Sequence, residues 1–241
     1  MRKGGQNRCA DRIAQRIFVN VAHTEAQPTM VTVILVRHGE TAWNRREVFR
    51  GRADVELNQR GRAQAQAVAA SLKKREVAAV YSSPLRRAIE TAQAIARPHN
   101  IPVRVEQGFI DFDYGSWQGM QHDEVRRRYP KLYQDWIERP HTVRIEGGES
   151  LRMVRRRAMN ALRNLAEQHP EETVVIVAHR VVNKVILCAV LGLDNSHFWR
   201  VRQDTCALNI LEWSRDQWAV QLLNDTCHLK GLPGTRLIAD F

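Results

Sequence analysis

Cysteine is scarce in this chain and shows no paired spacing. The four thiols, Cys9, Cys188, Cys206 and Cys227, lie far apart and include no CxxC pair. Disulfide frameworks and cysteine-rich metal sites need closely patterned cysteines, so we expect neither here. Isolated, unpaired thiols fit a reducing compartment, and the chain is predicted to be cytoplasmic.

Long apolar runs are also missing. No stretch approaches the roughly 18–20 apolar residues that are needed to cross a bilayer. The apolar run at 17–19 is too short for the hydrophobic part of a secretory signal. We therefore expect no membrane span, no membrane partner and no secretory leader.

Negative charge is in short supply. The chain has 37 lysines and arginines against 26 aspartates and glutamates, giving a net charge of +11. Such a balance suits anionic substrates, nucleic acid or an acidic membrane. The arginine runs at 126–128 and 155–157 lie in helical patterns without interleaved aromatics, which is typical of solvated helix faces. We expect no nucleic-acid partner and favour a small anionic substrate.

The length of 241 residues is sufficient for one sizeable core. Residues 1–29 lack a clean period and end at Pro28, so we predict a poorly ordered extension. It is either an upstream addition to a natural start at Met30 or an arginine-rich targeting peptide. A single domain is predicted over 30–225, followed by an irregular C-terminal tail over 226–241.

Apolar segments alternate with helical patterns along this domain. Strands that are separated by helices indicate an α/β three-layer sandwich, with a mostly parallel central sheet and helices on both faces. The last two strands are a short turn apart, so one edge of the sheet is expected to be antiparallel. Ser83, before Pro84, and Ser150 are the expected helix caps. The expected strands are 31–36, 77–82, 103–105, 173–178, 207–213 and 218–223, and the expected helices are 60–75, 84–97, 121–138, 150–168 and 181–192.

Cationic side chains follow three of these strands. The first strand ends at Arg37, His38 and Gly39, and the strand at 173–178 ends at His179. The strand at 77–82 leads into a helix whose first turn carries Arg87. Parallel strands end on the same side of a sheet, and helix N-termini favour phosphate. The sequence therefore predicts that these side chains converge on one anion. An aromatic, glycine-broken loop at 109–119, with its carboxylates Asp111 and Asp113, is a candidate wall and acid for this site.

These motifs together resemble the histidine phosphatase superfamily, in the branch related to cofactor-dependent phosphoglycerate mutase. The resemblance runs from about residue 32 to 223, in the order that the family has. It rests on Leu35–Thr41 with Trp43 and Asn44, on Gly51, Asp54, Leu57, Gly61 and Gln64, on Ser82–Ala92, on Gly115–Gly119, on Gly147–Ser150 and on Ala178-His179.

The resemblance implies a mechanism without a metal or other cofactor. His38 would attack phosphorus and become a phosphohistidine, which water then hydrolyses. Arg37, Arg87 and His179 would surround the phosphoryl oxygens, and Asn44 would donate a further hydrogen bond.

The sequence offers more than one candidate for the general acid. The family commonly has a glutamate four residues before the loop glycine, and in this chain the corresponding position is Asp111. Burial and the nearby dianion are expected to favour its protonated form. Asp113 is the rival, and Glu106 and Glu149 are more remote alternatives.

Two positions depart from the family pattern. Arg180 follows the second histidine, where the family usually has glycine, and Arg50 stands before Gly51, where glutamine is common. Arg180 either lies at the rim of the pocket, where it would contact a second anionic group of the substrate, or points to solvent. Arg50 and Gly51 are expected to line the entrance.

The first prediction is a phosphomonoesterase that acts on a small phosphorylated metabolite. A mutase would use the same histidine, but mutases of this family carry a longer insertion after the acid loop. Here the segment between Gly119 and Gly148 reads mostly as one helix, which favours hydrolysis. A non-catalytic, phospho-ligand-binding regulatory protein is the second alternative. The edge strand allows a homodimer but does not require one.

Overall fold

The computed structural model describes residues 30–232, and its centre is a six-stranded sheet in the order β3-β2-β4-β1-β5-β6. Strands β1 to β4 pair in parallel, whereas β5 pairs antiparallel with both β1 and β6. The predicted mostly parallel sheet with an antiparallel edge is thereby confirmed. The strands are β1 (Val31–Arg37), β2 (Ala79–Ser82), β3 (Val103–Val105), β4 (Thr173–Ala178), β5 (Leu208–Ser214) and β6 (Gln217–Asp225). The extension predicted at 1–29 and the end of the predicted tail, 233–241, lie outside the described residues.

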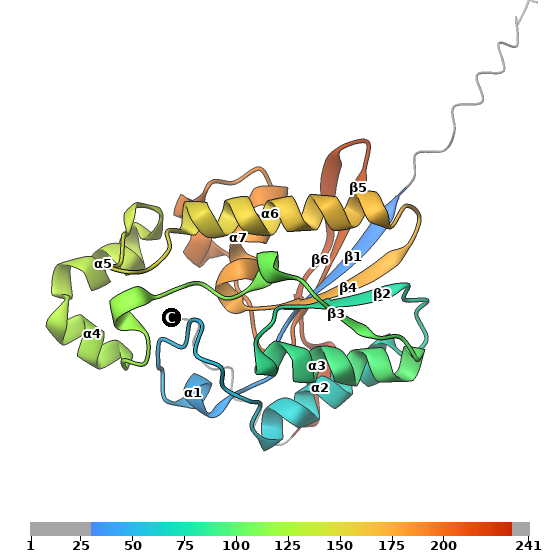
Figure 1. Ribbon diagram of the computed structural model, residues 1–241, viewed down its shortest axis with the longest axis horizontal. Coiled ribbons are helices and arrows are strands. Elements are labelled where there is room, and N and C mark those ends of the chain that lie inside the picture. Colours follow the sequence, from blue (N-terminus) through green and yellow to red (C-terminus); the bar gives the residue numbers. More distant parts are fainter. Residues whose placement is uncertain (1–29, 233–241) are drawn as a thin grey trace, which may run out of the picture.

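Helices cover both faces of the sheet (Figure 1). The pair α2 (Gln59–Leu72) and α3 (Arg86–Ala96) lies on one face, and α6 (Leu151–Gln168) with α7 (Arg180–Val190) lies on the other. Three shorter helices lie beyond the carboxyl ends of the parallel strands: α1 (Ala42–Arg45), α4 (His122–Arg128) and α5 (Pro130–Glu138). Short 3₁₀ segments occur at Arg97–His99, Gln107–Phe109, Gly115–Trp117, Pro140–Thr142, Asn195–Arg200 and Cys227–Leu229.

Successive side chains of β1 point to opposite faces of the sheet and so belong to two separate layers of the core. Val33 and Leu35 belong to the cluster under α6 and α7, whereas Ile34 and Val36 belong to the cluster under α2 and α3. All four are buried, as expected for a parallel strand with covers on both faces. Full burial of each such side chain contributes about 1.5–3 kcal/mol. The end of β1 is therefore held in place from both sides.

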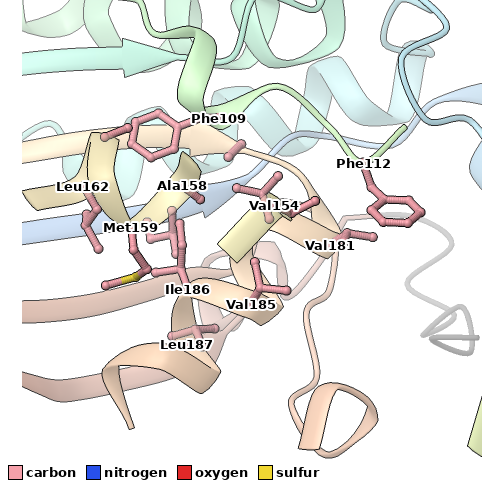
Figure 2. Close-up of a cluster of buried hydrophobic side chains, with 14 of the residues drawn as sticks. Phe109, Phe112, Val154, Ala158, Met159, Leu162, Val181, Val185, Ile186 and Leu187 are labelled. Atoms are coloured by element: carbon pink, nitrogen blue, oxygen red, sulfur yellow. The ribbon is translucent and has the colours of Figure 1, made fainter. Parts of the chain in front are cut away.

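The larger cluster also anchors the loop that carries Asp111. Phe109 and Phe112 are buried on either side of this residue, among Val154, Ala158 and Val181 of α6 and α7 (Figure 2). Two buried phenylalanines three positions apart fix the backbone between them, because moving it would expose both rings. Asp111 is positioned by the core rather than by a free loop.

One predicted cap is wrong. Ser150 caps α6 as predicted, since its side chain accepts a hydrogen bond from the backbone N–H of Met153. Helix α3, however, begins at Arg86 with Leu85 at its cap position, and the Asp54 carboxylate accepts from the backbone N–H of Arg86 at 2.7 Å. The hydroxyl of Ser83 is instead hydrogen-bonded to a histidine of the site described below. The same hydroxyl accepts from the Leu85 N–H at 3.4 Å, so Ser83 makes a tertiary contact beside a local one, but it lies before the helix start and does not cap it.

The helix expected over 121–138 is in fact two helices. Helix α4 ends at Arg128 and α5 starts at Pro130, with Tyr129 between them at φ −130° and ψ +53°. Proline disfavours the helical conformation of the residue before it, which explains the break. The helix expected at 181–192 begins one residue earlier and ends at Val190, before Gly192 at φ +71°.

Within residues 30–232, no helix is both long and apolar enough to cross a membrane. Strand β6 is an edge of the sheet, and pairing of two copies through it stays a prediction.

The turn after β1 lies against the first turn of α2, with almost no space between the two backbones. A Cβ on Gly61 would come 2.0 Å from the carbonyl oxygen of Glu40, and a Cβ on Gly39 would come 2.5 Å from that of Gly61. Asn58 caps α2 by accepting from Gly61 N–H at 2.8 Å, and it donates to the Glu40 carboxylate at 2.8 Å. The Gln64 amide oxygen accepts from Glu40 N–H at 2.9 Å. Glycine is required at this contact because any side chain would separate the two segments.

We expect Gly61→Ala to destabilise the protein by roughly 1–3 kcal/mol, as overpacking does. Alanine is otherwise favoured over glycine in a helix by about 1 kcal/mol, so helix propensity alone predicts the opposite sign. Chemical denaturation measures the difference. Ala70→Gly, at an exposed position of the same helix, is the control and should cost about 1 kcal/mol. A stabilised Gly61→Ala variant would contradict the close contact.

Candidate active site

His38 follows β1 and is completely buried. Its backbone N–H donates to the Ala178 carbonyl at 3.0 Å, which extends the β1–β4 pairing. Its Nδ1 lies 2.7 Å from the carbonyl oxygen of Gly39. A carbonyl oxygen can only accept, so Nδ1 carries the proton and Nε2 has the lone pair. Nε2 is therefore the nucleophilic atom of this ring.

Arg87, in the first turn of α3, faces that nitrogen. Its Nε donates to Nε2 of His38 at 3.3 Å. Its terminal nitrogens donate to the carbonyl oxygens of Ala53 and Gly51, each at 2.8 Å, and to Asp111 Oδ2 at 3.0 Å. The side chain is 0% exposed, so every one of these bonds is made away from water. A guanidinium held in this way has a fixed orientation.

His179 follows β4 and is also completely buried. The centre of its ring lies 5.1 Å from that of His38. Its Nε2 is 2.6 Å from the Ser83 hydroxyl, and its Nδ1 is 3.5 Å from Asp111 Oδ2. A proton on Nδ1 would face the carboxylate, so we assign the Nδ1–H form, with Nε2 accepting from the hydroxyl.

The Asp111 carboxylate lies next to Arg87 and His179. Its Oδ2 accepts from Arg87, and its Oδ1 accepts from the backbone N–H of Phe112 at 2.8 Å. The side chain is only 7% exposed. Of the carboxylates considered from the sequence, Asp111 is the one that lies against Arg87 and His179.

The other candidate acids are engaged elsewhere. Asp113 Oδ1 accepts from the Gly115 N–H, and its Oδ2 pairs with Arg52 at 3.3 Å. Both oxygens of Glu149 accept from Arg157 at 2.9 Å. The Glu106 side chain accepts from a backbone N–H within its own turn. These three groups hold the loops in place.

Burial and positive charge act on both histidines in the same direction. Desolvation first, and then the charge of Arg87, hold the pKa of His38 well below its usual 6.5, with His179, Arg37 and Arg50 adding to the effect. The pKa of His179 is lowered for the same first two reasons. Both imidazoles are thus neutral at pH 7. Desolvation also lowers the pKa of Arg87, and Asp111 opposes that shift.

The remaining residues predicted from the sequence lie around this centre. Arg37 is buried and donates to the carbonyl oxygen of Gln203. Asn44 is buried, and its Oδ1 accepts from both the N–H and the hydroxyl of Thr41. Only its NH₂ group is therefore oriented to serve an anion. Gly51, at φ +50°, contributes the carbonyl oxygen that holds Arg87.

Arg50 and Arg180 share a small cavity next to Asp111. It is lined by Val48, Phe49, Arg50, Gly51, Asp111, Tyr114, Arg180 and Val181. Arg180 thus points into the cavity, and its charge together with a hydrogen bond acts on the Tyr114 hydroxyl. Burial, followed by repulsion from Arg37 and Arg180, lowers the pKa of Arg50 to about 9. Arg50 therefore remains cationic at pH 7.

Two contributors were missed at the level of sequence. Ser83 lies 2.6 Å from His179, although it was expected to cap α3. His122 stacks on Phe49 with ring centres 4.1 Å apart, and desolvation, followed by Arg180 and Arg50, lowers its pKa to about 4. The position of Ser83 directly after a strand end was an available signal. No feature of the sequence around His122 indicated that it lies near the site.

This arrangement suits transfer of a phosphoryl group to nitrogen. A neutral imidazole presents its lone pair beside a fixed guanidinium, with a second histidine and a carboxylate adjacent. Fixed donors of this kind stabilise the charge that spreads over phosphoryl oxygens in the transition state. Among residues 30–232, no group of three His, Cys, Asp or Glu is arranged to hold a metal ion.

Comparison with known proteins finds phosphatases among the similar chains. The chain is 38% identical over 200 residues to phosphoserine phosphatase 1 of Hydrogenobacter thermophilus, covering 83% of this chain and 95% of that protein. The structure is similar to that of Bacillus stearothermophilus YhfR, with a TM-score of 0.80 and 31% identity over 83% of this chain and all of the other. Mycobacterial glucosyl-3-phosphoglycerate phosphatase Rv2419c matches with a TM-score of 0.75 and 28% identity, over 82% of this chain and all of that one.

The model of one family matches the chain over residues 33–226, which include all the strands after the start of β1 and every residue of the site described above. The chain belongs to the histidine phosphatase superfamily, branch 1.

Proposed function

We propose that the chain hydrolyses phosphate monoesters of small metabolites through a phosphohistidine on Nε2 of His38. The observation that carries this proposal is the fixed tautomer of His38, whose lone pair faces Arg87 at 3.3 Å. Relatives named for phosphoserine and glucosyl-3-phosphoglycerate support a small, phosphorylated organic acid as the substrate class.

In the first step, Nε2 attacks phosphorus and the bond from phosphorus to the ester oxygen breaks. The phosphoryl oxygens replace Asp111 as the partner of Arg87, and Arg37, His179 and the NH₂ group of Asn44 complete their surroundings. Asp111, released from Arg87, takes up the proton of the entering phosphate monoester monoanion and gives it to the departing alkoxide. The product is an alcohol, and the phosphoryl group stays on the histidine.

In the second step, water attacks the phosphohistidine. Asp111, now a carboxylate, accepts a proton from the water, and the bond between phosphorus and Nε2 breaks. Inorganic phosphate leaves, and Asp111 is protonated again for the next cycle. The segment between Gly119 and Gly148 holds the short helices α4 and α5, without the longer insertion expected of a mutase, which supports hydrolysis over isomerisation.

His38→Ala is expected to reduce phosphatase turnover by about 10³-fold or more, since it removes the atom that accepts the phosphoryl group. Release of inorganic phosphate measures the loss. His141→Ala, an exposed histidine of the 3₁₀ segment at 140–142, is the control and should keep the wild-type rate. Turnover by His38→Ala at the wild-type rate would falsify the assigned nucleophile.

Asp111→Asn is expected to slow hydrolysis of alkyl phosphates by about 10²–10⁴-fold, because an amide cannot protonate the alkoxide. The loss should be much smaller with p-nitrophenyl phosphate, whose leaving group hardly needs a proton. Comparison of kcat/KM for the two substrates tests this difference. Asp113→Asn is the matched control, and equal losses on both substrates in Asp111→Asn would count against the acid role.

His38 is expected to stay neutral, with the proton on Nδ1, as the pH falls through 6.5, because its pKa in the folded protein is depressed. An imidazole of the unfolded chain gains a proton near pH 6.5, so acidification below this value also costs folding stability. Two-dimensional ¹⁵N–¹H spectra of the imidazole nitrogens, assigned with His38→Asn, report the tautomer and the midpoint. A midpoint at or above 6.5 would contradict the electrostatics of the site.

A further inference from the structure

The loop that carries Asp111 is held from outside by a side chain of α6. Arg157 donates from one terminal nitrogen to the carbonyl oxygen of Gly108 at 2.8 Å. From the other terminal nitrogen it donates to the carbonyl oxygen of Asp111 itself at 3.1 Å. One guanidinium therefore spans the segment that leads to the candidate acid and ends on its backbone.

Loop and helix are in direct contact at this point. A Cβ on Gly108 would come 2.5 Å from the Cβ of Ala161 and 3.2 Å from the carbonyl oxygen of Arg157. The loop backbone thus lies directly against α6, which brings its carbonyl oxygens within reach of the guanidinium. Val154 and Ala158 of the same helix are buried in the larger core cluster, so the backbone that carries Arg157 is itself fixed.

Glu149 orients the guanidinium. Nε of Arg157 donates to one oxygen of the Glu149 carboxylate and a terminal nitrogen donates to the other, both at 2.9 Å. The same carboxylate accepts from the Asp113 N–H at 3.2 Å, and the Glu149 N–H donates to the Asp113 carbonyl at 2.9 Å. A bidentate carboxylate fixes the plane of a guanidinium. Arg157 and Glu149 together therefore contact the loop before Asp111, at it and after it.

The direction of the Asp111 side chain depends on these polar contacts. The buried rings at 109 and 112 hold the loop against the core, but apolar packing is non-directional and leaves the rotation of the peptide groups between them open. Hydrogen bonds are directional. An aspartate has a single methylene between backbone and carboxyl, so its carboxyl follows any rotation of its own peptide group. The bond from Arg157 to the Asp111 carbonyl oxygen therefore sets where the acid points.

Binding of substrate makes this contact more important. In the free protein Arg87 holds Asp111 Oδ2 at 3.0 Å, and the proposed mechanism gives that bond up to the phosphoryl oxygens. The bond that Oδ1 accepts comes from the Phe112 N–H, which belongs to the same loop and moves with it. Arg157 binds the main-chain carbonyl of Asp111 and not its carboxyl group, so this contact is retained when Arg87 turns to the phosphate.

We propose that Arg157, oriented by Glu149, is a positioning residue that holds the Asp111 carboxyl toward the leaving group once Arg87 has turned to the phosphoryl oxygens. This inference rests on the proposed function for the role of Asp111 as the acid. Arg157 acts on the acid and not on the nucleophile. Its removal therefore slows the substrates whose leaving group needs a proton.

The test compares leaving groups. We expect Arg157→Gln to lower kcat/KM for an alkyl phosphate by about 10–100-fold, the effect of a small misplacement of a reacting group. The loss with p-nitrophenyl phosphate should be much smaller, whereas a merely structural role would slow both substrates equally. Arg155→Gln is the matched control, because Arg155 lies on the same helix but donates to the Leu193 carbonyl, in a different loop, at 2.6 Å. It should keep the wild-type ratio of the two rates, and an equal change of that ratio in the control would overturn the inference.

Arg157→Lys separates the hydrogen bonds from the charge. Burial and Arg87 do most to lower the pKa of His179, and the charge of Arg157 adds to this effect. Lysine keeps the charge, but its single ammonium group cannot bind a carboxylate in bidentate fashion and two carbonyl oxygens at once. Most of the selective loss should therefore remain in Arg157→Lys. Alkyl phosphate hydrolysis at the wild-type rate in this variant would assign the effect to charge and overturn the inference.

Amide hydrogen exchange tests the hold on the loop without turnover. Orthovanadate, an oxyanion that resembles phosphate, is the probe that displaces Asp111 from Arg87. With orthovanadate bound, the amides of Phe112 and Asp113 should stay protected in the wild-type protein and exchange about 10-fold faster or more in Arg157→Gln. Unchanged exchange in that variant would overturn the inference. Circular dichroism checks that each variant is folded, and Arg157→Lys, which keeps the pairing of opposite charges with Glu149, takes both measurements if Arg157→Gln does not fold.

Asp111→Asn, measured alongside, separates this inference from the proposed function. A selective loss on alkyl phosphates in Asp111→Asn without one in Arg157→Gln would support the acid and overturn the positioning role. Equal losses on both substrates in Asp111→Asn, together with faster exchange in Arg157→Gln, would support the hold on the loop and contradict the acid role.

Discussion

The structure of the site depends on one buried guanidinium. Arg87 is withdrawn from water and donates to the carbonyl oxygens of Gly51 and Ala53, to Asp111 and to His38. Breaking one partner of a buried charge costs about 3–5 kcal/mol, so this side chain forces its acceptors to stay together. It thereby joins the end of β1, the segment before α2, the loop of Asp111 and the start of α3. The relative positions of the candidate site residues therefore follow from the hydrogen bonds that this buried cation requires.

Burial also sets the protonation states of the two histidines. Desolvation is the largest cause of the depressed pKa of His38 and also of His179. The surrounding arginines add to it, so the positive charge around His38, the proposed nucleophile, favours its neutral form. The positive charge of the arginines thus has two effects: it attracts phosphate, and it disfavours protonation of the imidazole, which keeps the lone pair free.

Much of the fold was predictable because periodicity and strand ends are local features. The strands at 103–105 and 173–178 and the cap at Ser150 follow directly from residue pattern. Where prediction failed, a tertiary contact or an overlooked proline was responsible: Ser83 contacts His179 rather than capping α3, and Pro130 divides one expected helix. The sequence also left two orientations open for Arg180, and the structure turns it into the cavity. Its neighbours there, Tyr114 and Arg50, are distant in sequence, so no local pattern could reveal that they meet.

The placement of β1 has a consequence for the order in which the molecule is made. Its neighbours in the sheet are β4 and β5, which begin at Thr173 and Leu208, whereas β1 itself begins at Val31. The strand that leads to His38 therefore gains its partners only after residues 173–214 have left the ribosome. Contacts of such long sequence separation form slowly. His38, the proposed phosphoryl acceptor, is therefore synthesised long before the strands that hold it, and it reaches its place in the site only after β4 and β5 have joined the sheet.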